Sequence, residues 1–188
     1  MSPILGIYAS QISGHLFTFP ASSYESIQTV TVGAGGASSV TFSSIPSTYT
    51  HLQIRSLNQT GANAVIRFNS DSSGTNYRAH YIEGDGANIS SGSVQAGGYD
   101  GGYAIVGKGT VSNMFGAAVI DILDYTNTNK YKVTRGVSGI GQNGSGYLDY
   151  ISSVWISTSA ISSITFASVG ASFSQYSSFA LYGIKGVA

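Results

Sequence analysis

The chain has 188 residues, of which only 9% are charged, and its formal net charge is zero. This length suffices for one large domain with a substantial core. Eight scattered Lys and Arg residues cannot form the basic stripe that phosphate contacts require, so nucleic acid is not an expected partner. No run approaches the roughly 18 apolar residues of a membrane span, so a membrane is not expected either. The absence of cysteine excludes disulfides and thiolate metal sites.

The composition favours an all-β fold. The chain has 25 glycines and is rich in Ser, Thr, Val, Ile, Tyr and Phe, a mixture typical of sheets joined by tight turns. Candidate strands follow one another about every ten residues, with turn signals between them, as in sandwiches and jelly rolls. We therefore predict a two-sheet antiparallel jelly-roll β-sandwich over residues 23–188, preceded by an N-terminal arm over residues 1–22.

The segment 1–22 differs in pattern from the rest of the chain. Ser2-Pro3 can start a short helix and Gly14 can end one, whereas alternating strands begin only after Pro20. Its apolar side chains need cover, so we predict an attachment arm. Packing of the segment on its own domain is the alternative. The apolar residues of the predicted arm are Ile4, Leu5, Ile7, Tyr8, Ile12, Leu16, Phe17 and Phe19.

The first strands look like a hairpin. Residues 24–32 alternate apolar and polar side chains, Gly33-Ala34-Gly35-Gly36 can turn, and residues 39–42 can return. In residues 50–57 the alternation leaves one face apolar and the other polar, which predicts a strand with one wet face. Further strands are expected at 65–68, 77–82, 103–106, 115–125, 131–137, 147–156 and 161–166.

Two signals near the C-terminus are more specific. Asn143-Gly144 lies between two candidate strands and is a strong hairpin turn signal. The last candidate strand, residues 177–185, carries large side chains on both faces. We predict that it fills a central position in a sheet completed by the preceding strands.

Regular alternation fails between Glu83 and Gly102, where seven glycines occur. This pattern predicts a long, exposed and mobile insertion. Four tyrosines surround it, and tyrosine offers a flat apolar face with a polar tip. We predict an exposed recognition surface for a sugar or a protein, although tyrosine is also simply a good strand residue. The tyrosines are Tyr77, Tyr81, Tyr99 and Tyr103.

No motif points to catalysis. The three histidines lie outside any nucleophile elbow, which would be needed for an activated serine. The nearest carboxylate pairs are Glu83 with Asp85 and Asp121 with Asp124, and both suit a loop mouth or strand ends better than glycoside hydrolysis. We therefore predict a protein that is not an enzyme, with no catalytic residue and no cofactor.

A calcium ion near Asp71 is an open alternative. Residues 69–76 concentrate oxygen ligands around Gly74, but they lack the further carboxylates of a tight site. The same residue types also favour turns through their backbone preferences. No metal ligand is therefore predicted.

Two stretches resemble small structural proteins of tailed bacteriophages, particularly phages of aquatic bacteria and cyanobacteria. The first comprises residues 23–33 and 44–55, and the second residues 176–186. The likeness spans most of residues 23–186 and lies in strand and turn sequences. The resemblance therefore indicates a family of proteins rather than a particular role within the virion.

The resemblance implies a virion location. The leading expectation is a capsid decoration (cement) protein that contacts the major capsid protein or other virion proteins and stabilises the shell. The low charge favours such association, and a homo-oligomer, with a trimer favoured, is expected. The alternative is a tail or fibre component, an adhesin that binds host glycans.

Overall fold

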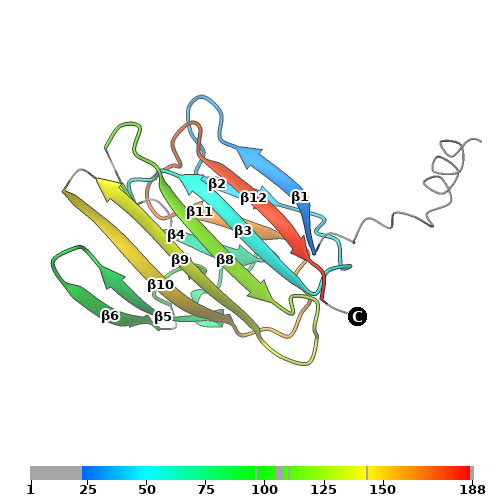
Figure 1. Cartoon of the computed structure of the whole chain (residues 1–188). Coiled ribbons are helices and arrows are strands. Elements are labelled where there is room, and N and C mark those ends of the chain that lie inside the picture. The colour runs from blue at the N-terminus through cyan, green and yellow to red at the C-terminus, as the bar shows by residue number, and fades with distance from the viewer. Residues whose placement is uncertain (1–22, 96, 105–107, 110, 143, 187–188) are drawn as a thin grey trace, which may run out of the picture.

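The computed structural model describes residues 23–95, 97–104, 108–109, 111–142 and 144–186. These residues form two antiparallel sheets, and α-helix is absent from them, which confirms the predicted all-β, two-sheet class (Figure 1). No helix in this part of the chain is long and apolar enough to cross a membrane. The predicted arm, residues 1–22, lies outside the described residues.

The two sheets differ in width. The larger contains, in spatial order, β1 (Tyr24–Thr31), β12 (Ser178–Ile184), β3 (His51–Asn58), β8 (Gly116–Leu123), β9 (Lys132–Gln142), β10 (Ser145–Trp155), β5 (Tyr77–Gly84) and β6 (Ile89–Val94). The smaller contains β2 (Ser39–Phe42), β11 (Ile164–Ser168), β4 (Ala64–Phe68) and β7 (Gly102–Ala104). The larger sheet therefore has eight strands, and the smaller sheet that packs against it has four.

The main core lies between the smaller sheet and the inner face of the larger one. Strand β12 lies inside the larger sheet, hydrogen-bonded to β1 on one side and to β3 on the other, as predicted for the last strand. Its Phe179 is fully buried, with its ring centroid 5.3 Å from that of Phe166 and 5.0 Å from that of Phe173. Such ring pairs add to the burial energy, so the last strand joins both layers.

The hairpin predicted at Asn143-Gly144 is confirmed. Strands β9 and β10 pair from Gln142 with Ser145 to Lys132 with Trp155. Gly144 has φ +97°, a left-handed conformation that residues with a Cβ adopt only with strain. These are the longest strands of the fold at 11 residues each, whereas β8, predicted as the longest, has eight.

The hairpin predicted for residues 24–32 and 39–42 is wrong. Strand β1 pairs with β12, and β2 pairs with β11 in the other sheet. Alternation shows which face of a strand is buried but not which strand lies beside it. The chain crosses between the sheets through Gly36, where a Cβ would come within 2.7 Å of the Phe173 carbonyl oxygen.

The insertion predicted for residues 83–102 is only partly irregular. Strand β6 pairs with β5 from Ala79 with Val94 to Gly84 with Ile89. The turn between them is held by Asp85, whose side chain accepts hydrogen bonds from the backbone N–H groups of Ala87 and Asn88. The serines and glycine in the sequence of β6 conceal the strand, because they lack the usual β-branched pattern.

Lys132 is a fully buried cation at the start of β9. Its ammonium donates hydrogen bonds to the backbone carbonyls of Asn127, Lys130 and Thr158, and thus joins the β8–β9 loop to the segment after β10. Desolvation, and to a lesser extent the charge of Lys130, lowers the pKa of Lys132. The carbonyls compensate a charge that burial alone would destabilise.

Replacing this ammonium tests its structural role. Lys132→Met should lower the free energy of unfolding by about 2–4 kcal/mol, because three backbone carbonyls lose the donor that joins them. The matched control is Lys130→Met, which removes an exposed lysine bonded to Asp124 and should cost about 1 kcal/mol or less. Urea denaturation measures both. Equal losses for the two variants would contradict this role of Lys132.

Candidate functional site

The smaller sheet covers only part of the inner face of the larger one. Strand β7, at the edge of the smaller sheet, lies against β10 and β5. The β5–β6 hairpin extends beyond this cover at the lower left of Figure 1. Apolar surface exposed there needs another cover, and aromatic side chains provide it.

Three tyrosines form this cover, and we call them the tyrosine cluster. The rings of Tyr99 and Tyr103 are stacked, with centroids 5.4 Å apart and an interplanar angle of 16°. The Tyr81 ring lies 5.4 Å from that of Tyr103 and is tilted by 47°. Tyr103 is buried against Ile151, and Tyr81 and Tyr99 are half-buried. Sequence analysis grouped these three residues, and the structure brings them together.

The tyrosine cluster is held in place by specific contacts. Asn63 Nδ2 donates a 3.0 Å hydrogen bond to Tyr99 Oη. The Tyr81 ring lies over Gly92, where an added Cβ would come within 2.6 Å of the hydroxyl oxygen. Burial, and then the nearby Tyr99 and Tyr81, raise the pKa of Tyr103, so its hydroxyl stays protonated. Contacts within the protein therefore position all three rings.

An open groove of about 530 Å³ lies beside the tyrosine cluster, and we call it the tyrosine groove. It follows the edge strand β6 and the chain after it, and none of the described side chains that line it is charged. Gln95 Nε2 donates a 3.3 Å hydrogen bond to Ser93 Oγ within it. The lining residues are Tyr81, Ser93, Val94, Gln95, Gly97, Gly98, Tyr99 and Tyr103.

Tyr77, which sequence analysis placed in the exposed surface, is instead buried at 2% exposure. Its hydroxyl accepts a hydrogen bond from the Phe68 N–H and donates one to the Asp71 carbonyl. Burial raises the pKa of Tyr77 to about 12. Tyr77 and Tyr81 point to the same side of β5, but Tyr77 lies beneath the smaller sheet, against Phe68 of β4.

A buried carboxyl group, Asp149, and a half-buried one, Glu83, lie next to the tyrosine cluster. Asp149 on β10 stands opposite Glu83 on β5 and is only 1% exposed. Ser138 Oγ donates a 3.4 Å hydrogen bond to Asp149 Oδ2, whereas Asp149 Oδ1 has no donor among the described residues. Burial, followed by the hydrogen bond with Glu83, raises the pKa of Asp149 to about 7. Asp149 therefore keeps its proton to a much higher pH than an exposed carboxyl group does.

Sequence analysis missed Asp149, although its inward position could have been found. It lies two residues before buried Ile151, so strand alternation places both on the inner face. The acid pairs that the sequence suggested are not brought together as pairs. Asp85 holds its own turn, and Asp124 contacts Lys130 and His51.

The loop suggested for calcium is organised around hydrogen bonds. Asp71 accepts them from Trp155 Nε1 and Asn76 Nδ2, each at 2.8 Å, and from the Ser73 N–H at 2.9 Å. Burial acts to raise the pKa of Asp71, but these hydrogen bonds outweigh it and the pKa is lowered. Within the described part of the chain, no group of three or more His, Asp or Glu residues could hold a metal ion.

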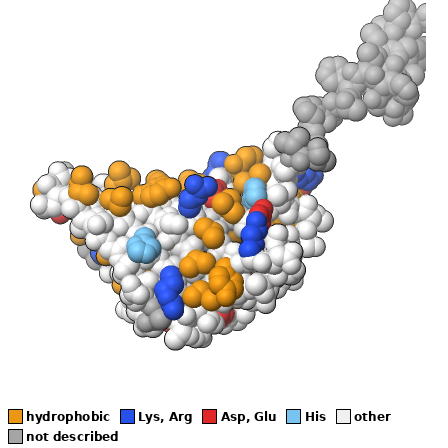
Figure 2. All heavy atoms as spheres, turned by 90° about the horizontal axis from the view of Figure 1, so that it is seen from below, with side chains coloured by type: hydrophobic (Ala, Val, Ile, Leu, Met, Phe, Trp, Pro, Cys, Tyr) orange, Lys and Arg blue, Asp and Glu red, His pale blue; other side chains and the backbone are white. Residues whose placement is uncertain are grey.

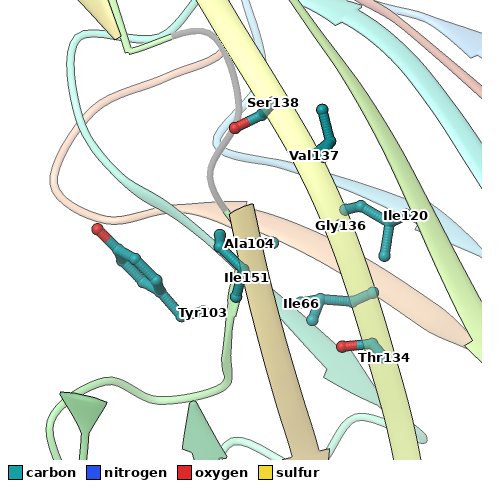
Figure 3. A pocket seen from close by; sticks show the side chains of 9 residues that line it. All are labelled: Ile66, Tyr103, Ala104, Ile120, Thr134, Gly136, Val137, Ser138 and Ile151. Carbon is teal, nitrogen blue, oxygen red and sulfur yellow. The ribbon is translucent and has the colours of Figure 1, made fainter. Parts of the chain in front are cut away.

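An enclosed cavity between the sheets is too small for an organic ligand. Its volume is about 10 Å³, room for one water molecule. Figure 3 shows its lining side chains, which come from β8, β9 and β10 on one side and β4 and β7 on the other. Gly136 contributes no side chain at an inward position of β9, so we interpret the cavity as a packing gap.

The outer face of the larger sheet carries a row of apolar side chains. Val119, Val137, Tyr150 and Ile82 are direct cross-strand neighbours on β8, β9, β10 and β5. Together with Leu148 they form the outer apolar face, and they are 41% to 64% exposed. Hydrophobic side chains run along the upper rim of Figure 2. These side chains are exposed to solvent within the part of the chain that the structure describes.

Comparisons with models of protein families, with characterised proteins and with solved structures gave no match for this chain. The phage resemblance therefore stays a prediction from the sequence.

The raised pKa of Asp149 makes the stability of the fold depend on pH. The folded-state pKa of Asp149, about 7, lies above its ordinary value of 3.8, so the stabilisation from its protonation is complete below pH 3.8 and is lost as pH rises through 7. Asp149→Asn mimics the protonated form. It should raise the free energy of unfolding at pH 8 by about 1–3 kcal/mol and flatten the pH dependence between these values.

Urea denaturation at a series of pH values measures this effect. Asp85→Asn, which changes an exposed acid in the β5–β6 turn, is the control and should keep the wild-type pH slope in the upper half of this range. An Asp149→Asn variant that is less stable than the parent at pH 8 would show that the buried carboxyl is needed in its charged form.

Proposed function

We propose that this chain is a non-enzymatic structural protein of a bacteriophage virion that decorates the capsid and stabilises the shell through protein–protein contacts. The observation that carries the proposal is the outer apolar face, which has no cover within the described part of the chain. The resemblance of residues 23–33, 44–55 and 176–186 to phage structural proteins supports the virion location. The partner is the major capsid protein or another virion protein.

The strand connections support a jelly-roll topology, which is part of the proposal. The first five strands alternate between the two sheets at every connection, from β1 to β5. Crossing between layers at successive connections is a feature of double-sheet jelly rolls.

The edge at β1 is poorly suited to pairing with another strand. This favours the outer apolar face over the β1 edge as the contact surface. The register between β1 and β12 shifts between Ser26 and Gln28. An ion pair between Glu25 and Lys185 lies at the same edge, and charges and bulges both discourage strand addition. Low overall charge also reduces the cost of removing water from a large contact.

We also propose a homo-oligomer, with a trimer favoured, because virion shells place decorations at symmetry axes.

The alternative, a tail or fibre component that binds host glycans, is favoured by one specific observation, the tyrosine groove. Its lining combines aromatic rings with neutral polar groups. Copy number separates the two functions, since decoration requires hundreds of copies in each particle and a tail location far fewer.

The outer apolar face can be tested by reconstitution. The double variant Val137→Ser/Tyr150→Ser should fold normally, because both side chains already contact water, and should bind particles at least tenfold more weakly. Tyr176→Ser is the matched control, since Tyr176 is 70% exposed but precedes β12 outside this face. The number of copies bound to stripped particles is the measurement. Full occupancy by the double variant would exclude this face as the capsid contact.

The role of the predicted arm in attachment can be tested separately. Deleting residues 1–20 should leave a folded domain with the parent's melting temperature that no longer binds the particle. Burying several hundred Å² of apolar surface at about 25 cal/mol per Å² contributes on the order of 10 kcal/mol before ordering costs. If the truncated protein melts like the parent and still decorates particles, the arm is not the attachment. A sharp fall in melting temperature would instead indicate that the segment packs on its own sheets.

A further inference from the structure

We propose that the tyrosine groove binds a neutral glycan, with a sugar ring seated against the Tyr81 and Tyr99 side chains. This inference goes beyond the capsid contact and does not depend on it. The two half-buried rings line the groove together with the buried Tyr103, which both of them contact. Aromatic faces suit the C–H faces of a pyranose, which are apolar although its rim is polar.

Contacts within the protein hold the aromatic side chains of the groove in place. Tyr99 is held by its stack on Tyr103 and by the hydrogen bond from Asn63, and Tyr81 is packed over Gly92. Because these side chains are ordered before a ligand arrives, little conformational entropy is lost on binding. Pre-formed sites of this kind are typical of small-ligand recognition.

The charge of the groove selects a neutral ligand. Ser93 and Gln95 offer a hydroxyl and an amide, which can donate and accept hydrogen bonds. The nearby cations are engaged elsewhere, since Arg67 is bonded to Asp100 and the Lys108 ammonium lies 4.9 Å from the centroid of the Tyr147 ring. An acidic sugar or a phosphate would therefore find no free counter-charge within the groove.

The size and position of the groove fit an extended chain of sugars. A volume of about 530 Å³ falls within the range of roughly 300–1,000 Å³ typical of ligand sites. The groove follows edge strand β6, at the opposite edge of the larger sheet from β1, where residues 1–22 join the domain. A protein attached through that end would present the groove away from its attachment.

The test uses the full-length protein and NMR titration. The probes are maltotriose, cellotriose, chitotriose and mannotriose as neutral glycans, a galacturonic acid trimer as the acidic comparison, and an extended serine-rich peptide. At least one neutral probe should shift the amide signals of Ser93, Gly97 and Gly98 at millimolar concentration. The acidic trimer should bind at least tenfold more weakly than that probe.

Two variants locate the site. Val94→Trp enlarges a side chain that lines the groove on the same face of the sheet as Tyr81, and it should weaken binding at least tenfold. Gln95→Ala should weaken binding severalfold. Ser91→Trp is the matched control, because Ser91 is exposed on the same strand but does not line the groove. Melting temperatures show whether each variant is folded, and particle decoration by Val94→Trp should stay normal.

The proposal fails if no neutral probe shifts these signals, or if Val94→Trp binds the glycan as well as Ser91→Trp does. It also fails if the acidic trimer binds as tightly as the neutral probes. Binding of the peptide alone along β6 would identify the groove as a strand-addition site for protein. Because decoration is measured separately, failure of the glycan site and failure of the capsid contact are distinguishable.

Discussion

The mismatch in width between the two sheets is the constraint on which the rest of the structure depends. With strands about 4.8 Å apart, eight strands span about 34 Å and four span about 14 Å. The smaller sheet can therefore bury only part of the larger sheet's inner face. The main core, with Phe166 and Phe179 in contact across the layers, forms where cover exists. Beyond β7, other side chains have to cover the inner face of the larger sheet.

The tyrosine cluster provides this cover, and its position at the margin of the core has chemical consequences. Tyrosine can cover apolar surface with its ring while its hydroxyl faces water, so it suits the margin of a core. The same margin holds Asp149 and Glu83, where a carboxyl group is buried enough to retain a proton near neutral pH. Neither feature supplies a nucleophile with its base. The arrangement therefore favours binding, with an aromatic groove at one edge of the larger sheet and an apolar row on its outer face.

The sequence predicted the fold class and several strands because alternation and turn chemistry are local signals. The hairpin at Gly144 and the interior position of β12 followed from such signals. Pairing between distant segments is not local, which is why β1 and β2 were wrongly joined. The tyrosines show the same limit, since Tyr77 and Tyr81 look alike in sequence and differ only in whether the smaller sheet lies above them. Lys132 had no sequence signal, because backbone carbonyls define its site, two from the preceding loop and one from Thr158 after β10.

The central claim is that this chain attaches through its apolar surfaces and presents the tyrosine groove outward. A cryo-electron microscopy reconstruction of the particle that carries the protein tests it most directly. The account predicts density for the two-sheet domain on the shell, with Val137 and Tyr150 of the outer apolar face against a neighbouring subunit and β6 facing solvent. A map in which the groove beside Tyr99 is packed against the shell, or in which the outer apolar face is open to solvent, would contradict it.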